Sequence, residues 1–437
     1  MKITNSHQKF GMNLTAAIKT RLTLLSFFQF FVWGAWLTTI GTYCTEGKGW
    51  TFPQFGAIFS TLALSSIIMP SIIGIVADKW IRAERLYGIL HLTYAAFILL
   101  IPNISKLYEY FPSLQSMEEY DLLYWIIFGG MLAYMPTISL SNAVSFRILK
   151  MNNLDVQNDF PKIRVWGTIG FIAAMWLTNL SGSKANVNQF YIAGLGAIFL
   201  GLYAFSLPAC TPQGKTSQKQ SLSQQLGLNA FKLFAQYRMA LFFIFSILLG
   251  AALQLSNMYG DAYLSSFPEG TLVEKYSTII YSISQVSETI FILTIPFFLK
   301  RFGIKNVMLF ALLAWVLRYG FFAFGDSQIG ILLIVLSCVV YGMAFDFFLI
   351  SGSMFVEANT ESNIRSSAQG LFIMMTNGIG AYIGTKTSSY VIDHYYVLKS
   401  GKTDWHGAWL CFAAYCLVVA VLFMLFFKEK KQAVLQQ

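Results

Sequence analysis

Charged residues are scarce in this chain of 437 residues, since Asp, Glu, Lys and Arg together make up only 11% of it. A soluble protein carries about 25%. Hydrophobic residues make up 56% instead, and Phe alone occurs 40 times. So few charges cannot cover the surface of a soluble protein, and a disordered chain would not hold so many aromatic residues. The composition excludes a cytosolic enzyme and a secreted disulfide module, and it indicates an integral membrane protein.

Metal and cofactor motifs are also missing. The five Cys show no CxxC spacing, and the four His form neither HxxH nor HExxH, so we expect no metal site and no cofactor. No nucleophile–base pair points to an enzyme, and no Walker A motif is present, so any transport must use a gradient. The net charge of +10 does not indicate nucleic acid, because the Lys and Arg lie in short breaks between apolar runs.

Twelve apolar runs dominate the sequence. A helix that spans a membrane needs about 20 mainly apolar residues, and each run is near this length. Because the runs are continuously apolar rather than alternating, they exclude a membrane β-barrel. The sequence predicts twelve transmembrane helices, at about 22–43, 55–77, 86–104, 121–144, 161–180, 189–208, 239–264, 275–299, 307–325, 329–354, 366–392 and 406–427.

The distribution of basic residues predicts the orientation. With the N-terminus inside, the inner segments hold 21 of the 30 Lys and Arg, and the outer loops hold six. Inner loops of membrane proteins carry such an excess. We therefore expect both termini in the cytoplasm and a multi-pass protein of a bacterial inner membrane.

The middle of the chain interrupts the apolar pattern. Residues 209–225 are polar and basic and contain no acid, as is typical of a flexible linker. The following residues mix Phe with Lys and Arg, which predicts a short helix at the membrane surface. The expected organisation is a six-helix bundle over 1–208, a cytoplasmic segment over 209–238 and a second six-helix bundle over 239–437.

A short motif lies at the inner end of the second run. Gly74, Asp78 and Lys79 form the pattern Gly-x-x-x-Asp-Lys, and residues 300–305 hold a degenerate copy after the eighth run. We expect the glycine to allow close helix approach and Asp78 to meet a neighbouring helix end. With six runs on each side of a basic loop, this motif resembles the signature loop of the major facilitator superfamily. The resemblance implies alternating access, a substrate site between the halves near the midplane, and a gating role for the motif.

Only two acids lie well inside the predicted spans, Glu288 and Asp346. An ionisable group at membrane depth is costly, by about 2.5 kcal/mol or more, so these two carboxylates are candidates for proton coupling. The alternative is that each pairs with a buried base, such as Arg164, and ties two helices together.

Polar and aromatic residues recur at helical spacing in several spans. Any single stripe could be helix–helix contact, but stripes in both halves indicate a shared polar cavity. The stripes are Gln29, Trp33 and Trp36; Arg164, Thr168 and Phe171; Gln254, Asn257 and Asp261; Tyr281, Gln285 and Glu288; and Tyr341, Phe345 and Phe348, with Asp346 beside them.

The stripes limit the substrate to a neutral polar solute with a ring. Amides carry donors and an acceptor, which suit nucleobase edges and sugar hydroxyls. Phe171, Phe345, Tyr341, Trp33 and Trp36 offer faces for a planar ring, worth about 1–3 kcal/mol for each stacked base. From these residues alone, a nucleoside and a sugar both remain open.

Longer segments narrow the choice. WGAWLTTIGTY, FPKIRVWGTIGF, SISQVSETIFILTIPFF and VYGMAFDFFLISGS resemble the nucleoside:proton symporters of the major facilitator superfamily, and the similarity runs from about residue 21 to 428. The resemblance implies a nucleoside substrate and a coupled proton, and the positions that contact the substrate in this family match residues of this chain. These positions are Arg164, Thr168, Phe171, Gln254, Asn257, Gln285, Glu288, Tyr341, Phe345 and Asp346.

Three residues depart from the pattern of that family. Leu349 stands where members often carry Asn, Asp261 replaces a neutral residue, and Lys386 lies inside the eleventh run. Lys386 either extends outward to the membrane surface or neutralises an acid in the cavity. These departures leave the preferred nucleoside and the number of coupled protons open.

The sequence thus predicts a monomeric proton/nucleoside symporter with Asp346 and Glu288 linked to the proton. A sugar or oligosaccharide symporter of the same fold is the main alternative. A nutrient sensor that does not transport is a further one, although such a sensor would be expected to carry an added signalling domain.

Overall fold

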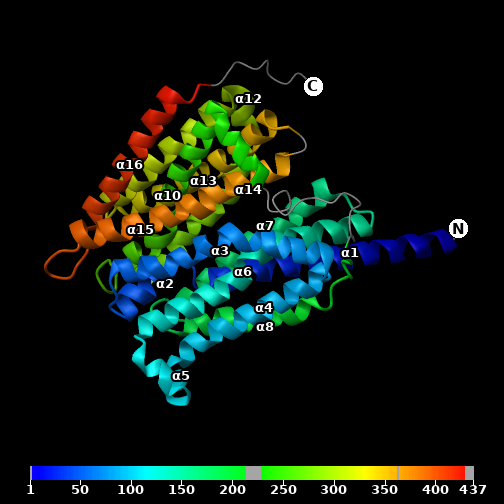
Figure 1. The fold of residues 1–437 in the computed structure, drawn as a ribbon, viewed down its shortest axis with the longest axis horizontal. Helices are drawn as coiled ribbons and strands as arrows, with labels where there is room; N and C mark the ends of the chain where they lie inside the picture. Colours follow the sequence, from blue (N-terminus) through cyan, green and yellow to red (C-terminus); the bar gives the residue numbers. More distant parts are fainter. Residues whose placement is uncertain (1, 213–227, 362–363, 429–437) are drawn as a thin grey trace. The chain divides into compact units, whose positions relative to one another are not determined.

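The computed structural model describes residues 2–212, 228–361 and 364–428 (Figure 1). Over these ranges the chain is helical, and its sole β-pairing is an isolated bridge between Val397 and Thr403. Residues 213–227, which form most of the predicted linker, lie outside the described residues. The predicted all-helical class is therefore confirmed.

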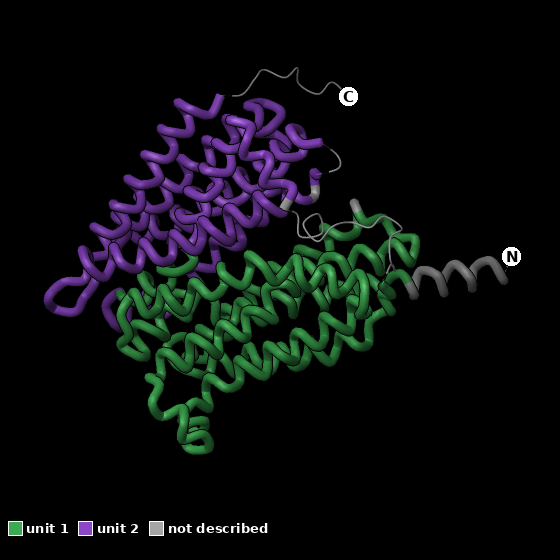
Figure 2. Tube along the Cα trace, in the orientation of Figure 1, with its two compact units in different colours: residues 1–225, 257–266, 276–279 green, residues 226–256, 267–275, 280–437 purple. Residues whose placement is uncertain are grey.

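The chain forms two compact units (Figure 2). Unit 1 holds residues 1–225, 257–266 and 276–279, and unit 2 holds 226–256, 267–275 and 280–437. The helix over residues 237–265 thus begins in unit 2 and ends in unit 1. The predicted bundle boundaries stay a prediction, because the units exchange these short segments.

Unit 1 is built mainly from the first eight α-helices. Within them, α3 begins with a capping box, in which the Thr51 hydroxyl accepts from the backbone N–H of Gln54 and the Gln54 side chain accepts from the backbone of Thr51. The elements are α1 (Lys2–Gly34), α2 (Ile40–Thr42), η1 (Tyr43–Gly47), α3 (Phe52–Lys79), α4 (Ala83–Leu100), η2 (Ile101–Asn103), α5 (Ile104–Tyr110), η3 (Pro112–Ser116), α6 (Glu119–Met151), α7 (Val156–Leu180) and α8 (Asn188–Ala204).

Unit 2 contains most of the remaining elements. They are η4 (Leu228–Ala235), α10 (Tyr237–Ser265), α11 (Leu272–Lys275), α12 (Ser277–Phe324), α13 (Ile331–Asn359), α14 (Arg365–Ile373), η5 (Met374–Gly380), α15 (Ala381–Val391), η6 (Ile392–Tyr396) and α16 (Trp405–Phe426). A short 3-10 helix, η4, forms in the segment for which a surface helix was predicted, and its place at the membrane surface stays a prediction.

A glycine divides the longest helix. Gly303 in α12 has φ 76° and ψ 168°, a backbone conformation that side-chain-bearing residues rarely adopt. The break separates two apolar segments, and these correspond to the predicted runs 275–299 and 307–325.

Eight helices in the described part of the chain are long and apolar enough to cross a membrane, and α8 is a shorter apolar helix. The chain is an integral membrane protein. Since α12 alone covers two predicted runs, a count of helices is not a count of spans, and the number twelve stays a prediction.

Candidate functional site

The α7 stripe of unit 1 depends on a close crossing of α1 and α7. A Cβ atom at Gly34 would lie 2.5 Å from the carbonyl oxygen of Phe171, and one at Gly170 would lie 2.1 Å from that of Phe27. Real Cβ atoms do not approach so closely, so both glycines are needed for this packing. The crossing therefore determines which part of α1 faces Arg164, Thr168 and Phe171 of α7.

Aromatic side chains of α1 surround this stripe. The Arg164 guanidinium lies 3.9 Å from the centre of the Phe30 ring, a cation–π contact. The rings of Trp33 and Phe171 meet edge to face at 6.3 Å. The indole Nε1 of Trp33 is buried with no hydrogen-bond partner in residues 2–212, 228–361 and 364–428. This unused donor is consistent with Trp33 facing a ligand.

The other two members of the α1 stripe are not available to a substrate. Trp36 is fully buried, and its Nε1 donates to the Tyr94 hydroxyl at 2.7 Å. Gln29 is fully buried as well. The expectation that Trp36 offers a stacking face was therefore wrong, because helix packing already covers its ring.

Gln29 is the centre of a buried polar cluster, which we call the Gln29 hub. Its amide nitrogen donates to the Thr137 hydroxyl at 3.0 Å, and its amide oxygen accepts from the Tyr87 hydroxyl and lies 3.1 Å from Nε2 of His91. Its backbone carbonyl accepts from the Tyr134 hydroxyl at 2.6 Å. The hub joins α1, α4 and α6. Gln29 therefore serves helix–helix packing and is not part of the polar cavity.

In unit 2, a second close crossing sets the α13 stripe against α12. A Cβ atom at Gly342 would lie 2.5 Å from the carbonyl oxygen of Ser287. Beside it, the rings of Tyr341 and Phe345 stack at 5.6 Å with an interplanar angle of 12°. Phe348, the third ring of the stripe, is fully buried against Phe242 and serves packing instead.

Two acceptors on α12 and α13 have no hydrogen-bond partner in the described ranges of the chain. They are Oε1 of Gln285 and Oδ2 of Asp346, both buried. A buried acceptor without a donor costs about 1–3 kcal/mol, and Asp346 also interacts electrostatically with Glu288. A polar ligand or a proton would remove this cost. The alternative of a salt bridge between Asp346 and a base is not seen among the described ion pairs.

The α10 stripe divides between the two units. Gln254 is buried in unit 2, whereas Asn257 is partly exposed and belongs to unit 1. Asp261, also in unit 1, is fully buried and accepts hydrogen bonds from Thr42 at 2.8 Å and Thr278 at 2.6 Å. Its carboxylate therefore ties α2 to the start of α12, which explains how an acid is tolerated at this position.

Arg318 was not among the predicted site residues, although it lies inside the ninth apolar run. It is fully buried in unit 2. Its guanidinium donates to the hydroxyls of Ser256 and Ser284 and to the backbone carbonyl of Ser337, at 2.7–3.2 Å. We call this cluster the Arg318 hub. The guanidinium also lies 4.4 Å from the centre of the Tyr341 ring, so the hub adjoins the candidate site.

An arginine at membrane depth was the available signal for this hub. Its partners could not be inferred, because they are small hydroxyls and a carbonyl on α10, α12 and α13. The spacing of residues along one helix does not show which residues of other helices contact Arg318.

The predicted gating motif lies at the end of α3, with Asp78 and Lys79 exposed. A Cβ atom at Gly74 would meet nothing within 4 Å, so the expected close helix approach at this glycine is wrong for this structure. The gating role itself stays a prediction. Lys386 on α15 is exposed, in agreement with the outward-extending alternative.

Comparisons with known proteins identify the family of this chain. The sequence model of the family described as "Nucleoside H+ symporter" matches residues 16–432. Xanthosine permease of Escherichia coli (strain K12) is 45% identical over 418 residues, covering 94% of this chain and 96% of that permease. Nucleoside permease NupG of the same strain is 45% identical over 419 residues, with the same coverage. The crystal structure of nucleoside transporter NupG matches with a TM-score of 0.85 and 44% identity, covering 94% of this chain and all of that one.

Proposed function

The chain belongs to the nucleoside H+ symporter family, and from this premise we propose that it imports nucleosides together with protons across a bacterial inner membrane. Transport proceeds by alternating access, in a monomer with twelve spans and both termini in the cytoplasm. The relatives with 45% identity are permeases, which supports a transport role without enzymatic chemistry.

The nucleoside contacts we propose are the ten positions carried by the stripes. They are Arg164, Thr168, Phe171, Gln254, Asn257, Gln285, Glu288, Tyr341, Phe345 and Asp346. The observation that supports them best is the pair of unpartnered buried acceptors, Gln285 Oε1 and Asp346 Oδ2, in the unit that carries the stacked rings of Tyr341 and Phe345. A nucleobase has both a face for such rings and N–H donors for such acceptors.

Proton coupling is assigned to Asp346 and Glu288. The two carboxylates interact electrostatically, and two negative charges in one buried place repel each other. Taking up a proton relieves this repulsion and lowers the cost of moving the loaded site through the membrane. Release of the proton on the cytoplasmic side restores the charge and favours release of the nucleoside.

Uptake measurements test the whole proposal. Cells that lack their own nucleoside permeases and express this chain should accumulate labelled uridine, adenosine or xanthosine, and a protonophore should abolish accumulation. An excess of unlabelled uridine should compete with the label, whereas free ribose should not. Competition by ribose as strong as that by uridine would favour the sugar symporter, and a complete lack of uptake by a well-expressed protein would favour the sensor.

The motif of Gly74, Asp78 and Lys79 is proposed to hold one inner arrangement of the helices. No stripe residue lies on α3, so substitutions in the motif should slow transport with little effect on binding. A population shift lowers apparent affinity only by the fraction of competent protein that is lost. Transport by a well-expressed Asp78→Asn protein at the wild-type rate would contradict this role.

A further inference from the structure

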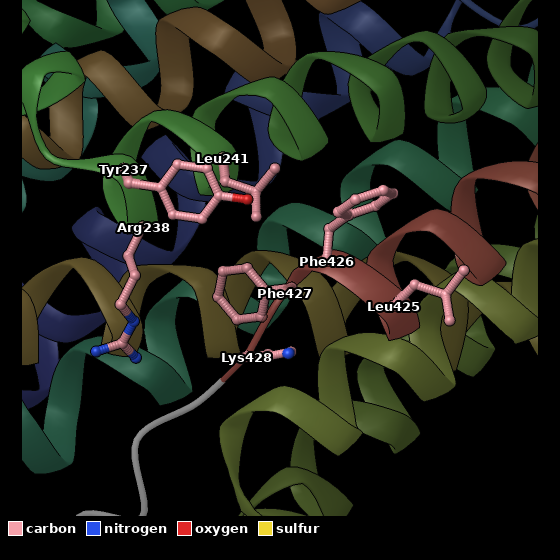
Figure 3. A pocket seen from close by; sticks show the side chains of 7 residues that line it. All are labelled: Tyr237, Arg238, Leu241, Leu425, Phe426, Phe427 and Lys428. Carbon is pink, nitrogen blue, oxygen red and sulfur yellow. The ribbon is translucent and has the colours of Figure 1, made fainter.

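A cavity of about 510 Å³ lies at the end of unit 2 where α10 begins and α16 stops. Figure 3 shows its lining, with Tyr237, Arg238 and Leu241 from α10 opposite the residues that end α16. None of the stripe residues lines it. Its volume falls in the range of small-molecule sites, yet the proposed transport cycle gives it no role.

Positive charge is the first notable property of this cavity. Arg238 and Lys428 both line it. The Nε of Arg238 is buried and has no acceptor among residues 2–212, 228–361 and 364–428, and its guanidinium lies 5.6 Å from the centre of the Phe355 ring. The ion pairs found in the same ranges include neither cation. A buried donor without an acceptor is costly, so the cavity is suited to an anion.

The chain's own flanking segments are poor sources of that anion. Residues 213–227, which precede η4, contain no Asp or Glu. Residues 429–437, which follow Lys428, contain one Glu and two Lys. Both segments would on balance add positive charge or none, so charge complementarity favours a partner from outside the chain.

Exposed apolar walls are the second notable property. Leu425 is 57% exposed and Phe426 52% exposed, and both line the cavity together with the ring of Tyr237 (Figure 3). A free phosphate ion would gain nothing from contact with these side chains. An amphiphile would use both parts of the cavity, placing its charged group on the cations and its chain along Leu425 and Phe426.

The position of the cavity supplies the third element. The excess of Lys and Arg places the start of α10 and the end of α16 on the cytoplasmic side. That leaflet holds anionic phospholipids, and basic pockets between membrane helices bind their headgroups.

We propose that this cavity binds the headgroup of an anionic phospholipid from the cytoplasmic leaflet. The planar guanidinium of Arg238 binds the phosphate oxygens in a bidentate manner, as arginine does at phosphate sites. Lys428 adds a second, more mobile charge, and the acyl chains follow Leu425 and Phe426 into the bilayer. The lipid thereby joins the start of α10 to the end of α16 and supplies an acceptor for the Arg238 guanidinium, whose Nε has none among the described residues.

Native mass spectrometry of the purified, delipidated protein tests this proposal. Phosphatidylglycerol and phosphatidylcholine are added separately, and the bound fraction is measured for wild type and for the double variant Arg238→Gln/Lys428→Gln. Each basic residue near an anionic membrane surface is worth roughly a fivefold change in affinity, so the double variant should bind phosphatidylglycerol about 25-fold more weakly.

The matched control is Lys232→Gln/Arg301→Gln. It removes the same charge from exposed residues of unit 2 that do not line the cavity, and it should retain wild-type binding. Phe426→Ser is a second test variant, and because Phe426 is half exposed it should fold normally. It should weaken phosphatidylglycerol binding if the acyl chain follows this wall.

Three outcomes would overturn the proposal. The first is equal phosphatidylglycerol binding by wild type and by the folded Arg238/Lys428 double variant. The second is phosphatidylcholine binding as tight as that of phosphatidylglycerol. The third is displacement of the lipid by millimolar inorganic phosphate together with unchanged binding by Phe426→Ser, which would make the cavity a site for a soluble phosphate.

Discussion

The two units hold their buried helices together with different kinds of polar hub. In unit 1 the Gln29 hub is neutral, since an amide meets hydroxyls and one imidazole. In unit 2 the Arg318 hub carries a full charge that is solvated by neutral groups. Each hub joins three helices through buried hydrogen bonds, so the two hubs do the same structural work with different charge.

The difference concentrates charge in unit 2. Tyr341 lies within electrostatic range of Arg318, Glu288 and Asp346 at once, whereas the Gln29 hub has no carboxylate in contact among its described hydrogen bonds. We therefore predict that unit 2 carries the coupled proton, whereas the buried acid of unit 1, Asp261, holds α2 and the start of α12 together.

The largest effect is expected for Asp346→Asn, which tests the assignment of the proton to unit 2. The variant should bind nucleoside but fail to accumulate it against a gradient, because the amide cannot take up and release the proton. Labelled uridine uptake by energised vesicles measures this. Asp261→Asn is the control in unit 1, since an amide can still bond with Thr42 and Thr278. Accumulation lost equally in both variants would refute the contrast between the units.

Removal of the charged hub should have the next largest effect. Arg318→Met leaves the hydroxyls of Ser256 and Ser284 and the carbonyl of Ser337 without their buried donor, so the free energy of unfolding should fall by roughly 2–4 kcal/mol. Thermal unfolding of the purified protein in detergent reports the loss. Arg318→Lys keeps the charge but loses the planar guanidinium, so its stability should lie between that of the wild type and that of Arg318→Met. A stable Arg318→Met protein would show that the hub is dispensable.

Gln285→Leu tests the unpartnered acceptor of unit 2. Because Oε1 of Gln285 has no donor in the described structure, its removal should not lower the stability of the empty protein. Nucleoside binding should weaken by about 1–3 kcal/mol, roughly 5- to 150-fold. Isothermal titration together with thermal unfolding separates the two effects. Unchanged uridine affinity would remove Gln285 from the site.

Gln29→Leu is the matching change in unit 1, and its expected effect is the smallest. Here the amide is already satisfied, so the cost falls on stability, about 1–2 kcal/mol for the hydroxyls and imidazole left unpaired. The affinity of the folded fraction for uridine should stay at the wild-type value. A loss of affinity without a loss of stability would reverse the roles assigned to the two glutamines.

The sequence predicted some of this contrast and missed the rest for a physical reason. Both glutamines occur in stripes with helical spacing, and spacing alone predicted the same role for both. The outcome depends on what the facing helices provide: Thr137, Tyr87 and His91 reach Gln29, whereas no described donor reaches Oε1 of Gln285. Trp36 and Phe348 were misjudged in the same way, because their stripes do not reveal which ring a neighbouring helix covers.

By itself, the sequence determined the membrane environment, the helical class and the family, since these depend on composition, run length and long stretches of similar residues. Tertiary structure alone decided which polar groups form hydrogen bonds between helices and which have no partner among the described residues. Helix crossings set by Gly34, Gly170 and Gly342 bring together residues that are distant in the chain, and hydrogen bonding acts over about 3 Å. The partners of Arg318 and the vacant acceptor of Asp346 therefore follow from the crossings and not from the order of residues.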